Sequence, residues 1–131
     1  MEVRMDLAQI VISETRDTQI IVLREREGNR NLPIVIGLTE ALAIDRRVKG
    51  LQLQRPLTHD LLGNVIDALS AELEKIVIND LQEHTFYAKL VIRQHGELIE
   101  VDSRPSDAIA LGVANEVPIY VEDHVLREVL Q

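Results

Sequence analysis

Apolar and polar residues alternate in the first part of the chain, which is the period of a β-strand with one buried face. Val3, Met5 and Leu7 follow this alternation, and the apolar phase shifts after Gln9 to Ile10 and Ile12. A phase shift within one strand indicates a β-bulge. The pattern therefore predicts a bulged strand at the start of the chain.

Two more strands are predicted before residue 37. Residues 20–23 read IIVL, a continuous apolar run typical of a strand that is buried on both faces. Residues 27–30 read EGNR and supply turn residues before a third strand over 32–36. We expect the three strands to form a meander.

Helical spacing of apolar residues begins after this meander. Leu38, Ala41, Leu42 and Val48 predict a short helix that ends before Gly50. A second helix is predicted from Thr58, the expected N-cap, with Asp60 opposing the helix dipole in its first turn. The apolar residues expected on one face of that helix are Leu62, Val65, Ile66, Leu69 and Leu73.

The second half repeats the order of strands followed by a helix. Strands are expected over 75–81, 85–93 and 98–101, with a turn at His95 and Gly96, and Phe86, Ala88, Leu90 and Ile92 on one strand face. Pro105 fits the first position of a helix, which makes Arg104 the expected N-cap. A strand from Pro118 through Val121 and a last helix capped by Asp123 complete the chain.

An internal repeat underlies this order. Residues 39–44 read TEALAI and residues 106–111 read SDAIAL, which match position by position in residue type. We therefore predict an α+β fold with one domain over 1–131, built from two three-strand-plus-helix units at about 2–50 and 74–121 around a mixed or antiparallel sheet. The helix from Thr58 is an insertion, and a helix ends the chain.

Composition narrows the function. The 131 residues carry a net charge of −8, which opposes nonspecific attraction to phosphates, and only three aromatic residues are present, too few for an extended base-stacking platform. The chain has no cysteine, which fits a reducing compartment, and we expect a cytoplasmic protein. No apolar run approaches the roughly 20 residues that span a bilayer, so no membrane association is expected.

Four motifs together extend over nearly the whole chain: LPIVIG with Glu40 and Ala41, RPLTHDL at 55–61, FYA at 86–88, and DSRPSDAIA at 102–110. In this order they resemble the motifs of the bifunctional nuclease family. The resemblance implies a small α+β domain that cleaves both DNA and RNA. Two segments depart from the family pattern: Val35 stands where a tryptophan is frequent, and Asp45, Arg46 and Arg47 replace small apolar residues. The two arginines could supply local positive charge.

Hydrolysis of a phosphodiester requires charge neutralisation and an activated water. Glu40 and Asp107 are hard oxygen ligands suited to a divalent cation, Mg²⁺ or Mn²⁺, and we expect them to flank one cleft. His59 is the predicted general base or acid, and Asp60 would orient it or bind metal. Arg55, Arg104 and Ser106 are the predicted substrate-binding residues, with Arg104 contacting phosphate as a planar fork.

Each of these residues also has a structural interpretation. Glu40, Asp60 and Asp107 could simply compensate helix dipoles, and His59 could be a surface or capping histidine. Arg104 could form an ion pair with Asp102, Asp107 or Glu40 that holds the two units together. Arg55 with Pro56 could form a rigid turn, Phe86 is expected in the core, and His84, His95 and His124 are expected to face solvent.

Two classes of function follow. The first is a metal-assisted nuclease that acts on DNA and RNA without strong sequence preference. The second is a non-catalytic interaction domain, in which the polar motif residues hold the repeats together or dock a protein partner. An exposed strand edge or the C-terminal helix could also form a homodimer.

Overall fold

The strands of this computed structural model, which describes residues 1–51 and 54–130, form one seven-stranded mixed sheet. Its order is β3-β2-β1-β7-β4-β5-β6, and only the β4–β7 pair is parallel. The strands are β1 (Glu2–Val11), β2 (Thr18–Glu25), β3 (Asn31–Gly37), β4 (Glu72–Gln82), β5 (Thr85–Gln94), β6 (Glu97–Ser103) and β7 (Ile119–Glu122). The predicted α+β fold is confirmed, as is the bulge, since the β1–β2 register shifts between Leu7 and Gln9.

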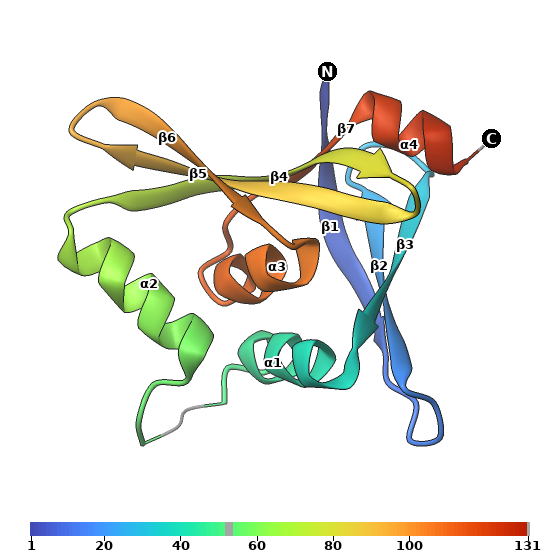
Figure 1. The fold of residues 1–131 in the computed structure, drawn as a ribbon, viewed down its shortest axis with the longest axis horizontal. Coiled ribbons are helices and arrows are strands. Elements are labelled where there is room, and N and C mark those ends of the chain that lie inside the picture. Colours follow the sequence, from blue (N-terminus) through green and yellow to red (C-terminus); the bar gives the residue numbers. More distant parts are fainter. Residues whose placement is uncertain (52–53, 131) are drawn as a thin grey trace.

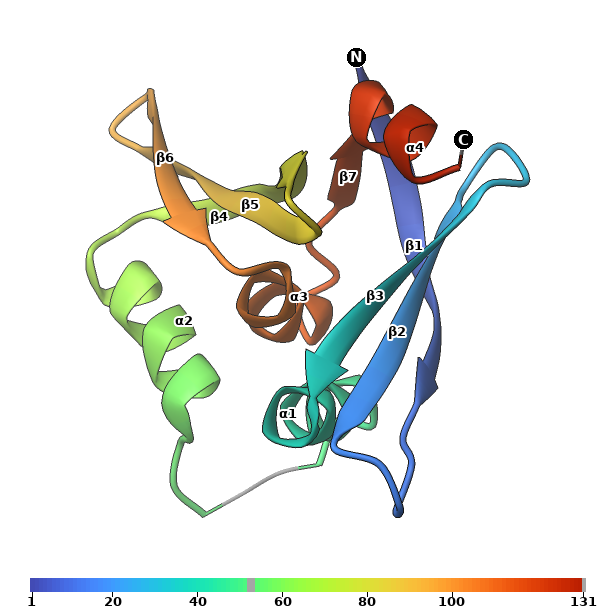
Figure 2. The same cartoon turned by 45° about the vertical axis from the view of Figure 1, so that its right-hand side comes forward.

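Three helices lie on the inner side of the bent sheet. Figures 1 and 2 show β1–β3 running steeply across the direction of β4–β6, with α1 (Leu38–Val48) and α3 (Pro105–Val113) inside the bend. In both views α2 (Thr58–Ala68) lies at the periphery, beyond α3. The short α4 (Asp123–Val129) lies beside the N-terminus, where Asp123 donates its backbone N–H to the carbonyl of Met1.

The core lies between the inner sheet face and the helices α1 and α3. Alternate strand residues such as Ile21, Ile34, Ile76 and Leu90 are buried there. The predicted face of β5 is confirmed, because Ala88 and Leu90 are buried while Phe86 and Ile92 pack against the core. Among residues 1–51 and 54–130, no helix is both long and apolar enough to cross a bilayer.

The prediction that residues 20–23 are buried on both faces is wrong. Gln19, Ile21 and Leu23 are fully buried, but Ile20 is 37% exposed. The helices cover only the inner face of this half of the sheet, so the outer side chains of β2 meet no second layer. The apolar run therefore predicts the strand correctly but not the exposure of its outer face.

The predicted apolar faces of α1 and α2 are also largely wrong. Helix α1 buries Ala41, Ala43 and Ile44 against the core, while Leu38, Leu42 and Val48 are exposed. Helix α2 buries only Ile66, and Leu73 belongs to β4. The reason is that α1 packs closely on α3 through small side chains, and the peripheral α2 has a neighbour along only a narrow stripe.

The observed starts of the helices agree better with the predictions from the sequence. Arg104 is the N-cap of α3 and Pro105 its first residue, as predicted. At α2 and α4 the predicted caps Thr58 and Asp123 are instead the first helical residues, and the N-caps are Leu57 and Glu122. Local chain geometry thus locates the starts of α2 and α4 to within one residue.

Candidate active site at the helix starts

Three of the predicted acids occupy the same place in three helices. Glu40, Asp60 and Asp107 are the third residues of α1, α2 and α3. At this position a carboxylate can accept a hydrogen bond from the backbone N–H of the N-cap residue and can oppose the helix dipole. The three acids differ, however, in what they contact.

Asp60 makes the contact expected of a capping residue. Its Oδ2 accepts the backbone N–H of Leu57 at 3.1 Å, and its Oδ1 accepts a hydrogen bond from Nη1 of Arg47. Among the described residues, its hydrogen bonds therefore go to the N-cap and to α1 and not to the ring of His59. This geometry supports the structural interpretation of Asp60.

Asp107 makes two contacts with other side chains. Its Oδ1 lies 3.1 Å from Nε2 of His59, and its Oδ2 accepts a hydrogen bond from Nε of Arg104 at 2.9 Å. The His59 side chain is 21% exposed and the Asp107 side chain 37%, so the pair is half-buried and open to solvent on one side. The fold thus brings together two predicted catalytic residues that are 48 positions apart in the sequence.

The charge state of Asp107 follows from its neighbours. Partial burial, the largest single influence, acts to raise the pKa of this carboxyl, but hydrogen bonds from Arg104 and His59 together outweigh it and lower the pKa. The hydrogen bond with Asp107 in turn raises the pKa of Arg104. Because an ionised carboxylate can only accept, Nε2 of His59 carries the hydrogen in this contact. When the ring is neutral, Nδ1 is then the nitrogen that can take up a proton.

Arg104 links Asp107 to Glu40. Its Nη1 lies 3.5 Å from Oε1 of Glu40, and the Arg104 side chain is 65% exposed. Ion pairs with Asp107 and Glu40 were one predicted alternative for Arg104, and both are present. We call the side chains of Glu40, His59, Arg104 and Asp107 the Arg104 cluster.

A cavity of about 370 Å³ adjoins the Arg104 cluster. Glu40, Arg104 and the predicted substrate-binding residue Ser106 line it, and Ser106 is itself buried. The remaining lining comes from β2, β3, β5 and the turn between β4 and β5, and includes His84, Thr85 and Phe86. His84 is exposed and Phe86 packs against the core, as expected, and both residues also line this cavity. The motif FYA and the turn residue His84 were the only sequence signals for this wall.

The starts of α1 and α3 both face this cavity. Gly37 is the N-cap of α1 and Arg104 that of α3, and both line the cavity. The positive ends of two helix dipoles favour an anion between them. The carboxylate of Glu40 lies over Gly37, where the Cβ atom of any other residue would collide with it.

The remaining basic residues lie elsewhere. Arg55 is exposed and is not among the cavity-lining residues. Arg47 is only 12% exposed and is paired with Asp60, so it does not add the free positive charge expected of the Arg46–Arg47 pair. Arg46 lines a small cavity of about 30 Å³ together with His59 and Asp60.

Glu40 and Asp107 are the two predicted metal ligands, and both contact the guanidinium group of Arg104. These carboxylates have the donor chemistry for Mg²⁺ or Mn²⁺. In the described part of the chain, no group of three or more histidine, aspartate or glutamate side chains could hold a metal ion.

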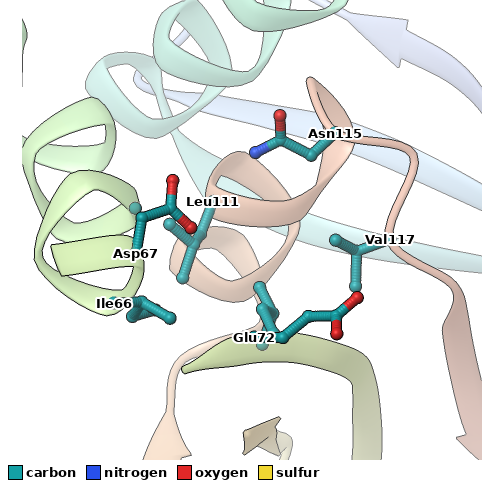
Figure 3. Close-up of a pocket in the computed structure, with 8 residues that line it drawn as sticks. Ile66, Asp67, Glu72, Leu111, Asn115 and Val117 are labelled. Carbon is teal, nitrogen blue, oxygen red and sulfur yellow. The ribbon is translucent and has the colours of Figure 1, made fainter. Parts of the chain in front are cut away.

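Another cavity, of about 210 Å³, lies between α2, α3 and β4 (Figure 3). Asp67, Glu72 and Asn115 provide its polar groups, and Ile66, Leu111 and Val117 part of its apolar lining. None of the predicted site residues lines it. The candidate site is therefore the Arg104 cluster with its adjoining cavity.

Comparison with known proteins agrees with the motifs. The family profile of the bifunctional nuclease domain matches residues 21–131. An uncharacterized protein of Mycobacterium tuberculosis is 44% identical over 119 residues, which cover 91% of this chain and 71% of that protein. Bifunctional nuclease 2 of Oryza sativa subsp. japonica is 30% identical over 114 residues, or 84% of this chain and 35% of its own length. Bifunctional nuclease 1 of Arabidopsis thaliana is 25% identical over 109 residues, which cover 80% of this chain and 34% of that protein. Because the profile match extends from β2 to the end of the chain and includes every residue of the Arg104 cluster, the chain belongs to the bifunctional nuclease domain family.

Proposed function

We propose that this protein is a nuclease that hydrolyses phosphodiester bonds in DNA and RNA without strong sequence preference, and that the Arg104 cluster is its active site. The observation that carries the proposal is the contact of His59 with Asp107, which shares its carboxylate with the exposed Arg104. A histidine oriented by a carboxylate beside an exposed guanidinium is a combination suited to phosphoryl chemistry.

Each member of the cluster has a distinct role in this proposal. Asp107 holds Nε2 of His59, which leaves Nδ1 to take a proton from the attacking water. The N–H groups of Arg104 that are not used by Asp107 and Glu40 contact the phosphate oxygens. The dipoles of α1 and α3 add positive potential at their starts, which offsets the net charge of −8 locally.

Ser106 and Arg55 contribute to substrate binding in this proposal. The Ser106 hydroxyl lines the cavity and can donate a hydrogen bond to the substrate. Arg55 is exposed beyond the N-cap of α2, where it can contact the backbone of a longer strand. Asp60 supports the site by capping the helix that carries His59.

Dependence on Mg²⁺ or Mn²⁺ is a separate part of the proposal. Glu40 and Asp107 would be the ligands, and a bound cation would neutralise phosphate charge. The proton transfer by His59 and the phosphate contact by Arg104 do not depend on it.

The experiment that tests the proposal is cleavage of labelled single-stranded and double-stranded DNA and RNA by the purified protein. Reactions are run in Mg²⁺, in Mn²⁺ and with chelator. The variant is His59→Gln, and the matched control is His124→Gln, because His124 also lies near an aspartate, Asp80, at 3.8 Å but does not line the cavity beside the Arg104 cluster. Loss of cleavage in His59→Gln alone supports the site. Equal cleavage by both variants excludes His59 as base, and inert protein under every condition excludes the nuclease.

One observation favours a second candidate, an interaction domain without catalysis. Arg104 forms ion pairs with acids of α1 and α3, as expected of a residue that holds the two repeat units together. Its 65% exposure argues against a purely structural pair, because exposed ion pairs contribute at most about 1 kcal/mol. Unchanged thermal stability of Arg104→Gln together with lost cleavage would exclude this candidate.

We further propose a cytoplasmic protein that forms a homodimer through the edge strand β6. The C-terminal helix is less suited, since its Val125 and Leu126 are fully buried in the protein's own core. Strand β6 is an edge of the sheet formed by the described residues, where it pairs with β5, and it exposes Leu98, Ile99 and Val101. Light scattering after size exclusion tests the dimer, and Ile99→Lys should produce monomer.

A further inference from the structure

Arg47 is an arginine with little exposure to solvent, although no motif singled it out. It projects from the last turn of α1, and its side chain is 12% exposed. Nη1 donates to Oδ1 of Asp60 in the first turn of α2, and Nη2 donates to the carbonyl oxygen of Leu111 in α3 at 3.0 Å. One guanidinium thus joins three helices.

The Arg47 contacts join the same two helices, α2 and α3, as the contact between His59 and Asp107. His59 precedes Asp60 in α2, and Asp107 lies one helical turn before Leu111 in α3. The pair His59–Asp107 and the bridge Asp60–Arg47–Leu111 therefore connect the same two helices at neighbouring positions. A displacement of the first turn of α2 would break both.

Helix α2 has few other anchors. Ile66 is its one buried residue, and it lies two turns away from His59. The apolar residues Leu61, Leu62 and Val65 are 41–55% exposed, so they do not fix the helix against the core. Polar contacts at its first turn must therefore determine where His59 points.

We propose that Arg47 is a positioning residue that sets His59 against Asp107 by holding the first turn of α2 to α3. The proposal concerns the geometry of the pair, and it rests on the proposed function only for the consequence in catalysis. A planar guanidinium is required because its two terminal nitrogens donate hydrogen bonds to a carboxylate and to a carbonyl oxygen at the same time. Among the residues that the structure describes, the buried Nε of Arg47 has no hydrogen-bond partner, so the contacts of the guanidinium group are those of Nη1 and Nη2.

The test is the nitrogen-15 NMR spectrum of the His59 ring, which reports hydrogen bonding at Nε2 and needs no substrate. Asp107→Asn defines the signal of a ring without its carboxylate. Arg47→Met keeps the aliphatic part of the side chain and removes the guanidinium group. Asp60→Asn weakens the same contact by changing its other partner, and it replaces Arg47→Met if that variant does not fold. The matched control is Arg46→Met, which removes the same charge from the neighbouring residue.

We expect the His59 signal of Arg47→Met and of Asp60→Asn to move most of the way to its position in Asp107→Asn, while Arg46→Met keeps the wild-type signal. A His59 signal that stays closer to wild type in either folded variant overturns the proposal. In cleavage assays Arg47→Met should lower kcat and leave KM unchanged, because Arg47 does not contact substrate. If the wild type cleaves nothing, the proposed function fails while the NMR comparison still decides the role of Arg47.

Discussion

His59 in α2 and Asp107 in α3 lie 3.1 Å apart, from Nε2 to Oδ1, although 48 positions separate them in the chain. Of the three acids at the third position of a helix, Asp107 is the one that contacts a histidine among the residues that the structure describes. Nε of Arg104 donates a hydrogen bond to the same carboxylate at 2.9 Å. The site is therefore asymmetric, because the corresponding acid of α1, Glu40, contacts Nη1 of the same arginine and, among the described residues, no histidine.

Replacement of Asp107 by asparagine should lower cleavage by about 10²–10⁴-fold, the usual contribution of general acid–base catalysis. The amide keeps the shape of the side chain but can no longer stabilise a charged His59. Asp123→Asn is the matched control, since Asp123 is also an acid in the first turn of a helix and is paired with Arg30. Initial rates on RNA and DNA measure the effect, and a comparable loss in both variants would contradict the assignment.

Asp107 should also make stability depend on pH in the acid range. Its pKa is lowered below the ordinary value of 3.8, so its contribution is fully present above that value and is lost as pH falls through the lower, folded-state value. The difference in free energy of unfolding between wild type and Asp107→Asn should therefore be larger at neutral pH than well below pH 3.8. Urea unfolding at both pH values measures it; a difference that does not change with pH would contradict the ionised state.

Two glycines in helices should respond in opposite ways to alanine. A Cβ at Gly112 would lie 3.1 Å from Cβ of Val117 and closer still to Ile76, so Gly112→Ala should lower stability by about 1–3 kcal/mol. At Gly63 the nearest atom would be Cδ1 of Leu111 at 3.7 Å, an ordinary contact, so Gly63→Ala should raise stability by about 0.5–1 kcal/mol. Thermal unfolding of the two variants tests the close packing of α3 on β4. A Gly112→Ala variant that is more stable than wild type would exclude this packing.

The buried face of α2 can be tested with two neighbouring residues. Ile66 is 8% exposed and Val65 is 44% exposed. Ile66→Ala should cost about 2–4 kcal/mol of stability, and Val65→Ala less than about 1 kcal/mol. Chemical unfolding measures both, and equal losses would mean that a partner covers the exposed side of this helix in solution.

Much of the fold could be predicted because it depends on local rules. Proline at position 105 restricts Arg104 to extended angles, and this located the start of α3 correctly. The alternation of Phe86, Ala88, Leu90 and Ile92 identified the inner face of β5, because the side chains of a strand have a fixed period. The apolar run at 20–23 predicted the strand but not its exposure, which depends on whether a helix covers the second face.

The candidate site was predicted only in part, for the same reason. Glu40, His59, Arg104 and Asp107 were selected by residue type and by position at helix starts, and the fold brings them together. Asp60 was expected beside His59 and instead contacts Arg47, which had been considered only as a source of charge. His84 and Phe86 were placed outside the site and line its cavity.

By itself, the sequence determined the elements, the helix starts and the family, because backbone angles, side-chain period and motifs are properties of neighbouring residues. Only the tertiary structure decided which acid meets His59, what Arg104 and Arg47 join, and which faces of α1 and α2 are buried. Those contacts form between segments up to 64 positions apart, such as Arg47 and Leu111, and they depend on how the helices pack against one bent sheet. Packing is set by all the facing side chains together, so no single stretch of the chain encodes it.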